Sequence, residues 1–222
     1  RPGHYSNRVK KNMAKIDEVK EQVIIGKTKI VPGLVQEALN EGSAAKDILQ
    51  AMIDGMKVVG DRFSAGEIFV PEMLIAAKAM AKGVEVLKPQ LSSEASTSLG
   101  TCIIGTVEGD LHDIGKNLVN MMIGSAGFDM VDIGVDQAPS KFIEAIKNNK
   151  NVKLVACSAL LTTTLPALKK TVDAIRESGL TGFKVIVGGA PVTQKFADEI
   201  GADAYAPDAG AAAEKAKAIV AA

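Results

Sequence analysis

The chain has 222 residues, enough to bury a full core in one large domain or in two small ones. Lysine plus arginine and aspartate plus glutamate number 26 each, so no overall charge favours nucleic acid or an anionic membrane as a partner. Hydrophobic residues make up 47% of the chain, but no run approaches the roughly 18 apolar residues of a membrane span. These features predict a soluble protein whose partners are selected by local surfaces.

The first 89 residues show the spacing of helices. Residues 1–8 are predicted to be a disordered tail, and residues 9–89 a four-helix bundle, because apolar side chains recur there at every third or fourth position. The expected helices cover residues 9–25, 32–42, 43–66 and 71–89. Residues suited to helix ends mark these limits: Pro32 and Pro71 as openers, Ser43 as an N-cap, and Gly42, Gly66 and Pro89 as terminators.

The second half of the chain changes period. Residues 90–98 are rich in serine and are predicted to be an interdomain linker, after which strands and helices alternate over residues 99–222. Strands are expected near 99–107, 128–133, 152–158, 183–188 and 203–206, and helices near 114–126, 139–149, 165–178, 192–200 and 209–221. This alternation predicts a flavodoxin-like or Rossmann-like α/β domain, a five-stranded parallel sheet of order 2-1-3-4-5 with flanking helices. The whole chain is thus predicted to combine an α domain with an α/β domain.

Two cysteines, Cys102 and Cys157, lie inside apolar strand-like runs with no second cysteine nearby. This placement is typical of small buried core residues rather than of a metal site or a redox pair. Unpaired cysteines of this kind suit a reducing cytoplasm.

The stretch Gly109-Asp110-Leu111-His112-Asp113-Ile114-Gly115 stands between the first predicted strand and the helix after it, and it holds one of only two histidines. Its position puts Asp110 and His112 at the carboxyl edge of the sheet, where open α/β folds bind ligands. Small and hydroxylated residues dominate the loops that share this edge: Ser158, Thr162, Thr163, Thr164, Gly188, Gly189 and Ala190. Such loops would leave a slot for an elongated ligand.

Considered alone, a single histidine beside aspartates is more often a hydrogen-bonded loop residue than a metal ligand. A zinc hydrolase fits poorly, because zinc needs three or four ligands and only His4, in the tail, could add a second imidazole. A phosphate-binding loop also fits poorly, since Gly105, Gly109 and Gly115 do not form Gly-x-Gly-x-x-Gly and no Gly-Lys-Ser or Gly-Lys-Thr occurs.

Three motifs considered together give a sharper interpretation. Asp110-x-His112-x-x-Gly115, Ser158-x-Leu160 and Gly188-Gly189 resemble the three-part signature of cobalamin-binding domains that hold cobalt through histidine. The spacing matches as well, with residues 116–157 and 161–187 between the motifs. The segment 66–74 (GEIFVPEML) resembles the cap module that precedes this domain in methionine synthase. Over nearly its whole length the chain is similar to corrinoid proteins of three-component methyltransferase systems.

The resemblance implies roles for individual residues. His112 would be the axial ligand of cobalt, Asp110 would accept a hydrogen bond from its other ring nitrogen, and Ser158 would extend this relay. Phe69, together with Met73 and Leu74, would cover the upper face of the corrin, with ordinary bundle core as the alternative for Met73 and Leu74. The other expected contacts of cobalamin are Gly109, Leu111, Asp113, Ile114, Gly115, Leu160, Thr162, Thr163, Gly188, Gly189 and Ala190.

The resemblance further implies a cytoplasmic corrinoid methyl carrier that does not turn over alone. It would accept a methyl group on Co(I) from a substrate-specific methyltransferase and pass it from methyl-Co(III) to an acceptor-side methyltransferase, with tetrahydrofolate or a thiol such as coenzyme M as acceptor. A reductive activator would be a further partner; nucleic acid and membrane would not. The methyl donor stays open among methylamines, methanol, betaines and aryl methyl ethers.

Two rivals remain within cobalamin proteins. A cobalamin-dependent sensor or regulator usually carries a DNA-binding helical segment, and the ends of this chain show no basic recognition helix. A mutase subunit would require a substrate barrel that 222 residues cannot include.

Overall fold

Two units make up the chain, and the computed structural model describes residues 3–91 and 98–222 of it. The first unit is Arg1–Thr97 and the second is Ser98–Ala222. The division falls inside the stretch 90–98, which the sequence assigns to a linker, and residues 92–97 of that stretch lie outside the described residues.

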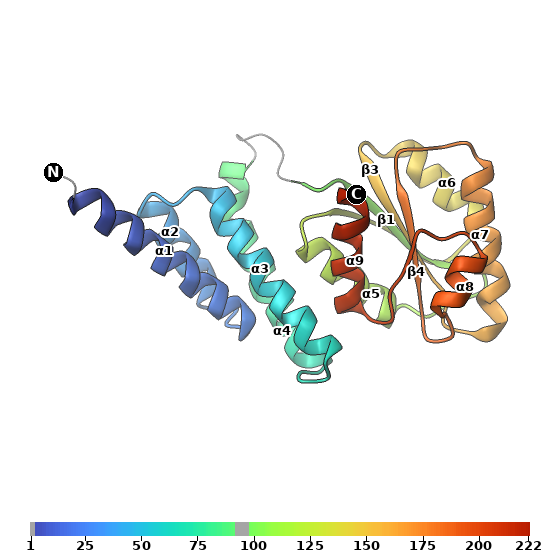
Figure 1. Ribbon diagram of the computed structural model, residues 1–222, viewed down its shortest axis with the longest axis horizontal. Coiled ribbons are helices and arrows are strands. Elements are labelled where there is room, and N and C mark those ends of the chain that lie inside the picture. Colours follow the sequence, from blue (N-terminus) through green and yellow to red (C-terminus); the bar gives the residue numbers. More distant parts are fainter. Residues whose placement is uncertain (1–2, 92–97) are drawn as a thin grey trace. The chain divides into compact units, whose positions relative to one another are not determined.

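The first unit is helical, as predicted. Its described helices are α1 (Gly3–Ile24), α2 (Val31–Asn40), α3 (Ala45–Ser64) and α4 (Val70–Leu91) (Figure 1). The apolar positions of the helical pattern form the core between them, with Val19, Val35, Met52, Met73 and Leu87 all fully buried. Their burial removes large apolar side chains from water and is the main force that holds the bundle together.

Helix limits in this unit differ from the prediction at three points. Helix α1 begins at Gly3, within the stretch 1–8 that the sequence assigns to a tail, rather than near residue 9. Helix α4 continues through Pro89, because a proline close to a helix end removes only one late backbone hydrogen bond. Ser43 does not cap helix α3, whose N-cap is Ala44 without a side-chain bond.

The backbone of Ser43 explains its failure as an N-cap. The Ser43 N–H donates to the Ala38 carbonyl over 3.0 Å, and the Gly42 N–H donates to the Leu39 carbonyl over 3.0 Å. With Gly42 at φ +93°, these bonds form a Schellman motif at the end of α2. Ser43 therefore belongs to the C-terminal cap of one helix rather than to the start of the next.

The second unit is the predicted parallel sheet. Its strands are β1 (Thr101–Val107), β2 (Asp129–Gln137), β3 (Val152–Ser158), β4 (Lys184–Gly188) and β5 (Ala204–Tyr205), in the order β2-β1-β3-β4-β5. All neighbouring strands are parallel. The connecting helices are α5 (Ile114–Ser125), α6 (Pro139–Asn148), α7 (Leu165–Glu177), α8 (Gln194–Glu199) and α9 (Ala209–Ala221).

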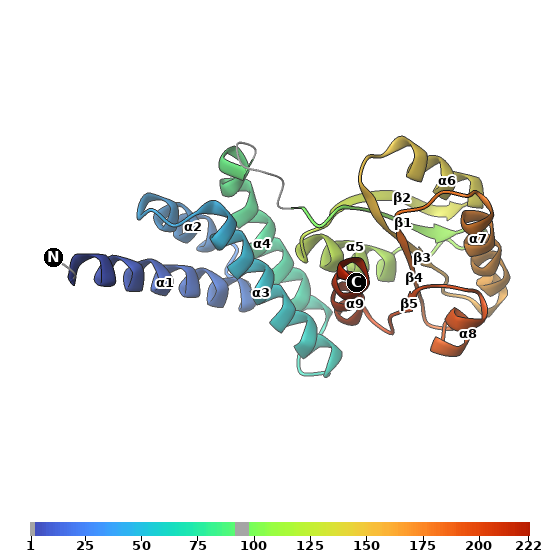
Figure 2. The same cartoon turned by 45° about the horizontal axis from the view of Figure 1, so that its top comes forward.

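Helices cover both faces of this sheet (Figure 2). One face packs Ile104, Leu154 and Ile186 against α5 and the alanine-rich α9. The other packs Ile103 and Val155, among others, against α6, α7 and α8. Because both faces are buried, strands β1, β3 and β4 are runs of mostly apolar residues, which is why they were recognisable in the sequence, whereas the edge strand β2 also carries exposed aspartates.

The two cysteines are buried and unpaired, as predicted. Cys102 lies in the core beneath α5 and α9, and Cys157 lies in the core on the opposite face. Burial raises the pKa of the Cys157 thiol to about 12, so the thiol stays protonated and unreactive.

Three details of this unit differ from the prediction. Strand β2 extends beyond the predicted 128–133, and its pairing with β1 shifts register on either side of Gly105. A short 3₁₀ helix, η1 (Thr162–Thr164), precedes α7 and was not predicted. Strand β5 has only two residues, where four were expected.

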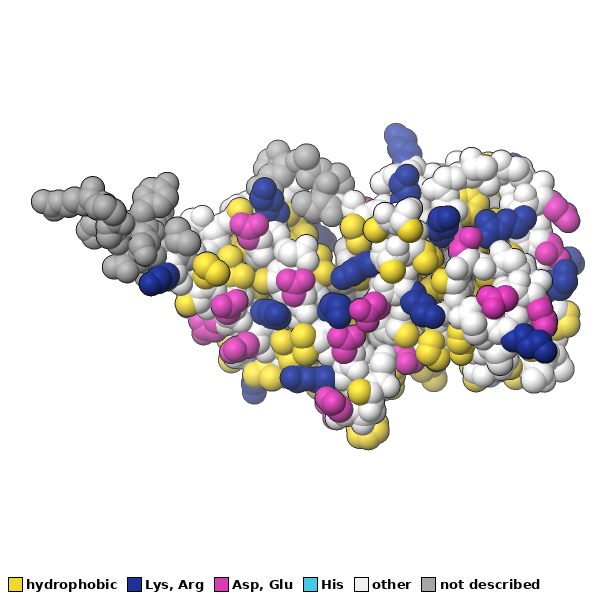
Figure 3. Space-filling model, viewed as in Figure 1, with side chains coloured by type: hydrophobic (Ala, Val, Ile, Leu, Met, Phe, Trp, Pro, Cys, Tyr) yellow, Lys and Arg dark blue, Asp and Glu magenta, His cyan; other side chains and the backbone are white. Residues whose placement is uncertain are grey.

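Surface charge is mixed. Lysine, arginine, aspartate and glutamate side chains alternate over the face drawn in Figure 3. In the part of the chain that the structure describes, no helix is long and apolar enough to cross a membrane.

Candidate functional site

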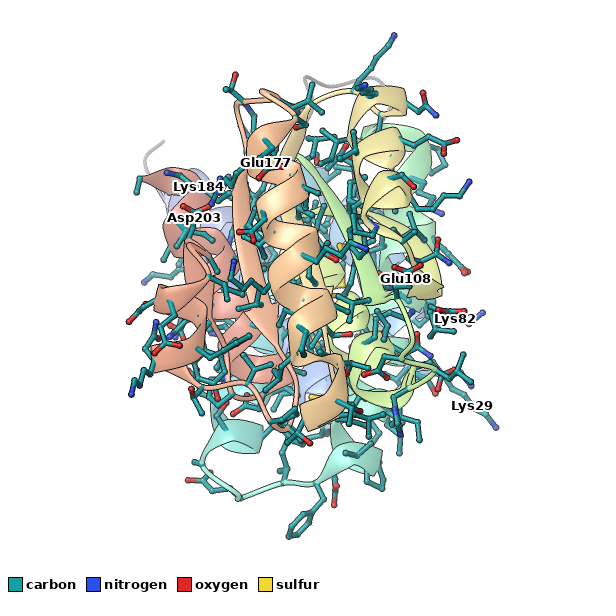
Figure 4. The ribbon with its side chains drawn as sticks, turned by 90° about the vertical axis from the view of Figure 1, so that its right-hand side faces the viewer. Lys29, Lys82, Glu108, Glu177, Lys184 and Asp203 are labelled. Carbon is teal, nitrogen blue, oxygen red and sulfur yellow. The ribbon has the colours of Figure 1, made fainter. Side chains whose placement is uncertain are left out.

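The loops predicted to share the carboxyl edge of the sheet do meet there. Figure 4 marks this edge by Glu108, directly after β1, while Glu177, Lys184 and Asp203 mark the opposite edge. The Leu160 N–H, after β3, donates to Asp110 Oδ2 over 2.7 Å. The Ala159 N–H donates to the carbonyl of Gly188, at the end of β4, over 3.2 Å. Three loops far apart in sequence are thus joined by hydrogen bonds.

Asp110 is the centre of this arrangement. Its side chain is fully buried, yet both carboxylate oxygens are satisfied. Oδ1 accepts from the His112 N–H over 3.1 Å and contacts the ring Nδ1 of His112 at 2.8 Å. Oδ2 accepts from the Leu160 N–H and from the Thr164 hydroxyl, the latter over 2.8 Å. A buried carboxylate is tolerated only when its oxygens are paired in this way.

These contacts determine the charge of Asp110. Burial raises the pKa of its carboxyl, but the hydrogen bonds from Leu160, His112 and Thr164 lower it by more, to about 2 instead of the ordinary 3.8. Asp110 is therefore an anion at neutral pH.

The anion in turn determines the form of His112. Since an ionised carboxylate can only accept, Nδ1 of the neutral imidazole must carry the hydrogen, and Nε2 keeps its lone pair. The His112 side chain is 48% exposed, and no described residue hydrogen-bonds Nε2. The loop thus presents a fixed imidazole with an available lone pair at its outer nitrogen.

The Ser158 hydroxyl, predicted to extend the relay behind His112, contacts Thr106. The Ser158 hydroxyl lies 2.9 Å from the hydroxyl of Thr106, which itself donates to the carbonyl of His112 over 2.9 Å. Ser158 therefore supports the backbone of His112 through Thr106, and no described hydrogen bond joins its hydroxyl to Asp110. Thr164, four residues beyond Leu160, makes that contact instead.

The two glycines at the end of β4 lie close to neighbouring backbone. Gly189 has φ +128°, and a Cβ there would collide with the carbonyl oxygen of Ala159. A Cβ on Gly188 would lie 3.0 Å from the carbonyl oxygen of Ala206. The room left by these missing side chains is therefore occupied by neighbouring backbone, and the glycines let the loops approach one another closely. The open position is Gly115, where a Cβ would meet nothing within 4 Å.

Large apolar side chains on the loops of this edge face solvent. Leu111 and Ile114 are 72% and 75% exposed, and Leu160 and Leu161 are 39% and 40% exposed. Asp113, Thr162, Thr163 and Ala190 are exposed at the same edge. Clustered apolar groups of this size are costly to leave in water and mark a place for an apolar ligand.

Several residues that support the site were missed by the motif. Thr106 and Thr164 are buried, and each bonds to the histidine loop. Lys116 is buried at the start of α5 and contacts Asp132 of β2 at 2.5 Å. Asp136, at the end of β2, accepts from the Gly109 N–H over 2.7 Å. Lys116 could have been found from the sequence, because it is a charged residue on the apolar face of a predicted helix. The other contacts depend on the fold and have no such signal in the sequence.

The residues expected to cover a corrin differ in exposure. Phe69 is 67% exposed, and its N–H donates to the Glu72 carboxylate over 3.0 Å at the start of α4. Leu74 is 36% exposed, whereas Met73 is fully buried in the bundle. Met73 is therefore core, the alternative stated for it, and Phe69 and Leu74 are available for contacts.

The donor set fits one kind of metal group. Within residues 3–91 and 98–222, no three or more His, Cys, Asp or Glu side chains gather closely enough to hold a bare metal ion. A corrin ring, however, supplies four nitrogen ligands itself and requires a single axial donor from the protein. The lone imidazole, the apolar rim and the open space over Gly115 match that requirement.

Comparison with known proteins agrees with this geometry. Residues 100–216 match the B12 binding domain, and residues 15–88 match a second family, also described as B12 binding domain. The chain is similar to the methanol:cobalamin methyltransferase complex MtaBC of Methanosarcina barkeri, with a TM-score of 0.80 and 31% identity over 94% of this chain and 80% of that one.

Two relatives of known name are more similar in sequence. Dimethylamine corrinoid protein 1 of Methanosarcina acetivorans is 42% identical over 93% of this chain and 97% of its own length. Trimethylamine corrinoid protein 2 of the same organism is 45% identical over 84% and 89%. With two B12 binding domains and relatives of this similarity, the chain belongs to the corrinoid proteins of methylamine and methanol methyltransferase systems.

Proposed function

We propose that this corrinoid protein is a methyl carrier that serves two methyltransferases, one that loads a methyl group from a substrate and one that removes it. The observation that carries the proposal is the exposed imidazole of His112, fixed through Nδ1 by the buried Asp110 carboxylate, with Nε2 hydrogen-bonded to no described residue. Two-domain relatives named for di- and trimethylamine support the same role.

In this proposal His112 Nε2 would hold the cobalt, and Asp110 fixes the tautomer in which Nε2 keeps its lone pair. The Leu160 N–H and the Thr164 hydroxyl hold the carboxylate, and Thr106 with Ser158 holds the backbone of His112. The bound corrinoid supplies a cobalt centre that accepts a methyl group and gives it up again.

The Asp110 and His112 pair would also link ligation to protonation. Nδ1 already carries one proton, so a second proton at Nε2 would remove the lone pair needed by cobalt. The resulting imidazolium would remain paired with the Asp110 carboxylate. A proton at Nε2 therefore separates the ligated form of the loop from the unligated one.

Other residues at this edge of the sheet would supply the remaining contacts with the cofactor. Leu111, Ile114 and Leu160 would meet the apolar edge of the corrin, and the absent side chain of Gly115 would let it approach the start of α5. Gly109 and Asp113 flank His112 in the same loop, while Thr162, Thr163 and Ala190, together with the glycines Gly188 and Gly189, would border the path of the nucleotide tail. Phe69 of the helical unit would contribute to covering the methyl group.

The proposal extends to partners and substrate. The complex of the methanol relative contains a methyltransferase, so we infer a substrate-specific methyltransferase as the loading partner. Identity with the di- and trimethylamine proteins exceeds that with the methanol complex, which favours a methylated amine as donor. A folate or thiol methyltransferase would be the acceptor, and a reductive activator would restore the reduced cofactor. The buried free thiols suit a cytoplasmic location.

Labelling can test the ligand directly. In the Co(II) state, the electron resonance spectrum of a single axial nitrogen ligand is split into three lines by ¹⁴N and into two by ¹⁵N. We expect protein grown with ¹⁵N-histidine and loaded with unlabelled cobalamin to show two lines, because the ligand comes from the chain. His4→Gly, which removes the other histidine, should leave the two lines intact, whereas His112→Gly should abolish them.

A methyl-transfer assay complements the spectral test. Methyl transfer by the loaded chain should require an added methylamine methyltransferase and should fail with His112→Gly. A spectrum that stays three-lined in labelled protein, or unchanged absorption and methyl transfer after His112→Gly, would remove the basis of the proposal.

A further inference from the structure

Strand β2 ends in an unusual conformation beside the histidine loop. Its pairing with β1 slips twice near Gly105, and Gly134 has φ +94°. Asp136 then has φ +52°, a left-handed conformation that residues other than glycine adopt at a cost. Aspartate and asparagine tolerate this conformation better than most residues. A strained residue at the edge of a proposed ligand site calls for a function.

Asp136 makes two hydrogen bonds to the loop that carries His112. Its Oδ1 accepts from the Gly109 N–H over 2.7 Å, and its own N–H donates to the Asp110 carbonyl over 2.9 Å. These bonds hold the backbone on both sides of the Asp110 Cα. The third backbone bond of this turn runs from the Asp110 N–H to the Val107 carbonyl over 3.2 Å, within β1's own end.

The orientation of Asp110 depends on this turn. Its carboxylate must reach the ring of His112 on one oxygen and both Leu160 and Thr164 on the other. Small rotations of the Asp110 backbone would move the carboxylate away from one set of donors. Thr106 restrains the far side of the loop through the His112 carbonyl, whereas Asp136 restrains the backbone next to Asp110 itself.

We propose that Asp136 is a positioning residue for the Asp110 and His112 pair, acting from the distorted end of β2 through the backbone of Gly109 and Asp110. It does not touch the cofactor in this proposal. Its carboxylate and its left-handed backbone together set the direction of the Asp110 side chain, and through it the tautomer and orientation of the imidazole. The functional meaning of the inference rests on the proposed role of His112 as cobalt ligand.

Three substitutions separate the two contacts. Asp136→Asn keeps an acceptor oxygen and tolerates the left-handed backbone, so it should behave like the unaltered chain. Asp136→Gly keeps the backbone conformation and its N–H but removes the acceptor. Asp136→Ala removes the acceptor and disfavours the conformation as well. Because Asp136 is exposed, none of the three leaves a cavity or an unpaired buried charge.

The readout is taken from the full chain before cobalamin is added. Amide hydrogen exchange at Leu160 reports whether Asp110 Oδ2 is still in place, fifty positions away in sequence. We expect this exchange to be faster in Asp136→Gly by roughly threefold or more, the lower range for a lost hydrogen bond, and faster still in Asp136→Ala. The Nδ1–H tautomer of His112, measured by ¹⁵N chemical shifts, should lose population in the same order.

Two controls identify a merely structural effect. Asp129→Ala removes an exposed carboxylate at the other end of β2 and should change neither reading. The Val185 N–H, which donates to Asp203 over 2.7 Å at the opposite sheet edge, should keep its exchange rate in every variant. Faster exchange at Val185 and Leu160 alike would mean general destabilisation and would overturn the proposal.

Unchanged exchange at Leu160 in Asp136→Gly, with faster exchange at Gly109 only, would likewise overturn it, because Asp136 would then hold a local turn and nothing more. If His112 is not the cobalt ligand, the electron resonance test shows it, because the unaltered labelled protein would then give a three-lined spectrum. The two failures are therefore distinguishable.

Discussion

The buried carboxylate of Asp110 yields the sharpest prediction, through the substitution Asp110→Asn. The amide has nearly the same shape, but it replaces one acceptor oxygen by a donor NH₂ group. Each carboxylate oxygen accepts one backbone N–H, from His112 or from Leu160. Whichever way the amide turns, one of these two N–H groups faces another donor.

The other two contacts can adapt. The Thr164 hydroxyl also lies 3.0 Å from the Leu161 carbonyl and can donate there, and the His112 ring can move its hydrogen from Nδ1 to Nε2. The expected cost is therefore that of one unsatisfied buried backbone donor, about 1–3 kcal/mol of unfolding free energy. Loss of the carboxylate also removes the reason for the Nδ1–H tautomer.

The pH dependence of this cost has a definite sign. The pKa of Asp110 is about 2 in the folded chain and 3.8 ordinarily, so the carboxylate stabilises the fold above pH 3.8 and this stabilisation is lost as pH falls toward 2. The lowering is worth roughly 2 kcal/mol at most, because solvent at the exposed His112 ring screens part of it. The stability difference between the unaltered chain and Asp110→Asn should therefore shrink between pH 5 and pH 3.

Urea unfolding at pH 7, 5, 4 and 3 measures this difference, and ¹⁵N shifts of His112 measure its tautomer. The reasoning is refuted if Asp110→Asn unfolds within about 0.5 kcal/mol of the unaltered chain at pH 7, the variation usual for surface substitutions. A stability difference that grows as pH falls would refute the sign.

Three further predictions use matched pairs. Thr164→Val should lower the unfolding free energy by about 1 kcal/mol, and Thr164→Ser should restore most of it, as measured by urea unfolding. Gly189→Ala should cost about 2 kcal/mol or more because of its φ of +128° and the collision it creates. Gly115→Ala should leave thermal stability unchanged or raise it, yet weaken cobalamin binding in a titration, since its Cβ enters open space. Lys116→Met should cost about 1–3 kcal/mol by breaking a largely buried ion pair, whereas Lys141→Met, at an exposed pair, should cost about 0–1 kcal/mol.

The architecture was predictable because its signals are local. A strand buried on both faces is a mostly apolar run, and a bundle helix repeats its apolar residues with the helical period, so the places of the elements followed from the sequence. The strand order followed from their alternation and the rules for crossover connections. Helix limits were less predictable where two caps compete. Ser43 has the chemistry of an N-cap, but its backbone is held in the Schellman motif at the end of α2, and α3 begins one residue later with Ala44 as N-cap.

The site was predictable only in part, for the same reason. His112 and Asp110 are two residues apart, so their pairing is a local property of the loop. The partners on the other side of Asp110 come from the loop after β3 and from a 3₁₀ helix, and nothing in the residue type distinguishes Thr164 from Thr162 or Thr163. Register decides that only Thr164 is buried and aimed at the carboxylate.

The contacts also explain why three separated motifs behave as one. Leu160 reaches Asp110 through its backbone N–H, a contact that any residue except proline could make. Its leucine side chain must therefore serve something else, and it is 39% exposed among the apolar groups around His112. The second motif thus has two separable parts: a backbone donor that fixes the carboxylate behind the imidazole, and an apolar side chain that is exposed at the same edge. The third motif, through Gly188 and Gly189, brings the loop that carries both parts to its working position.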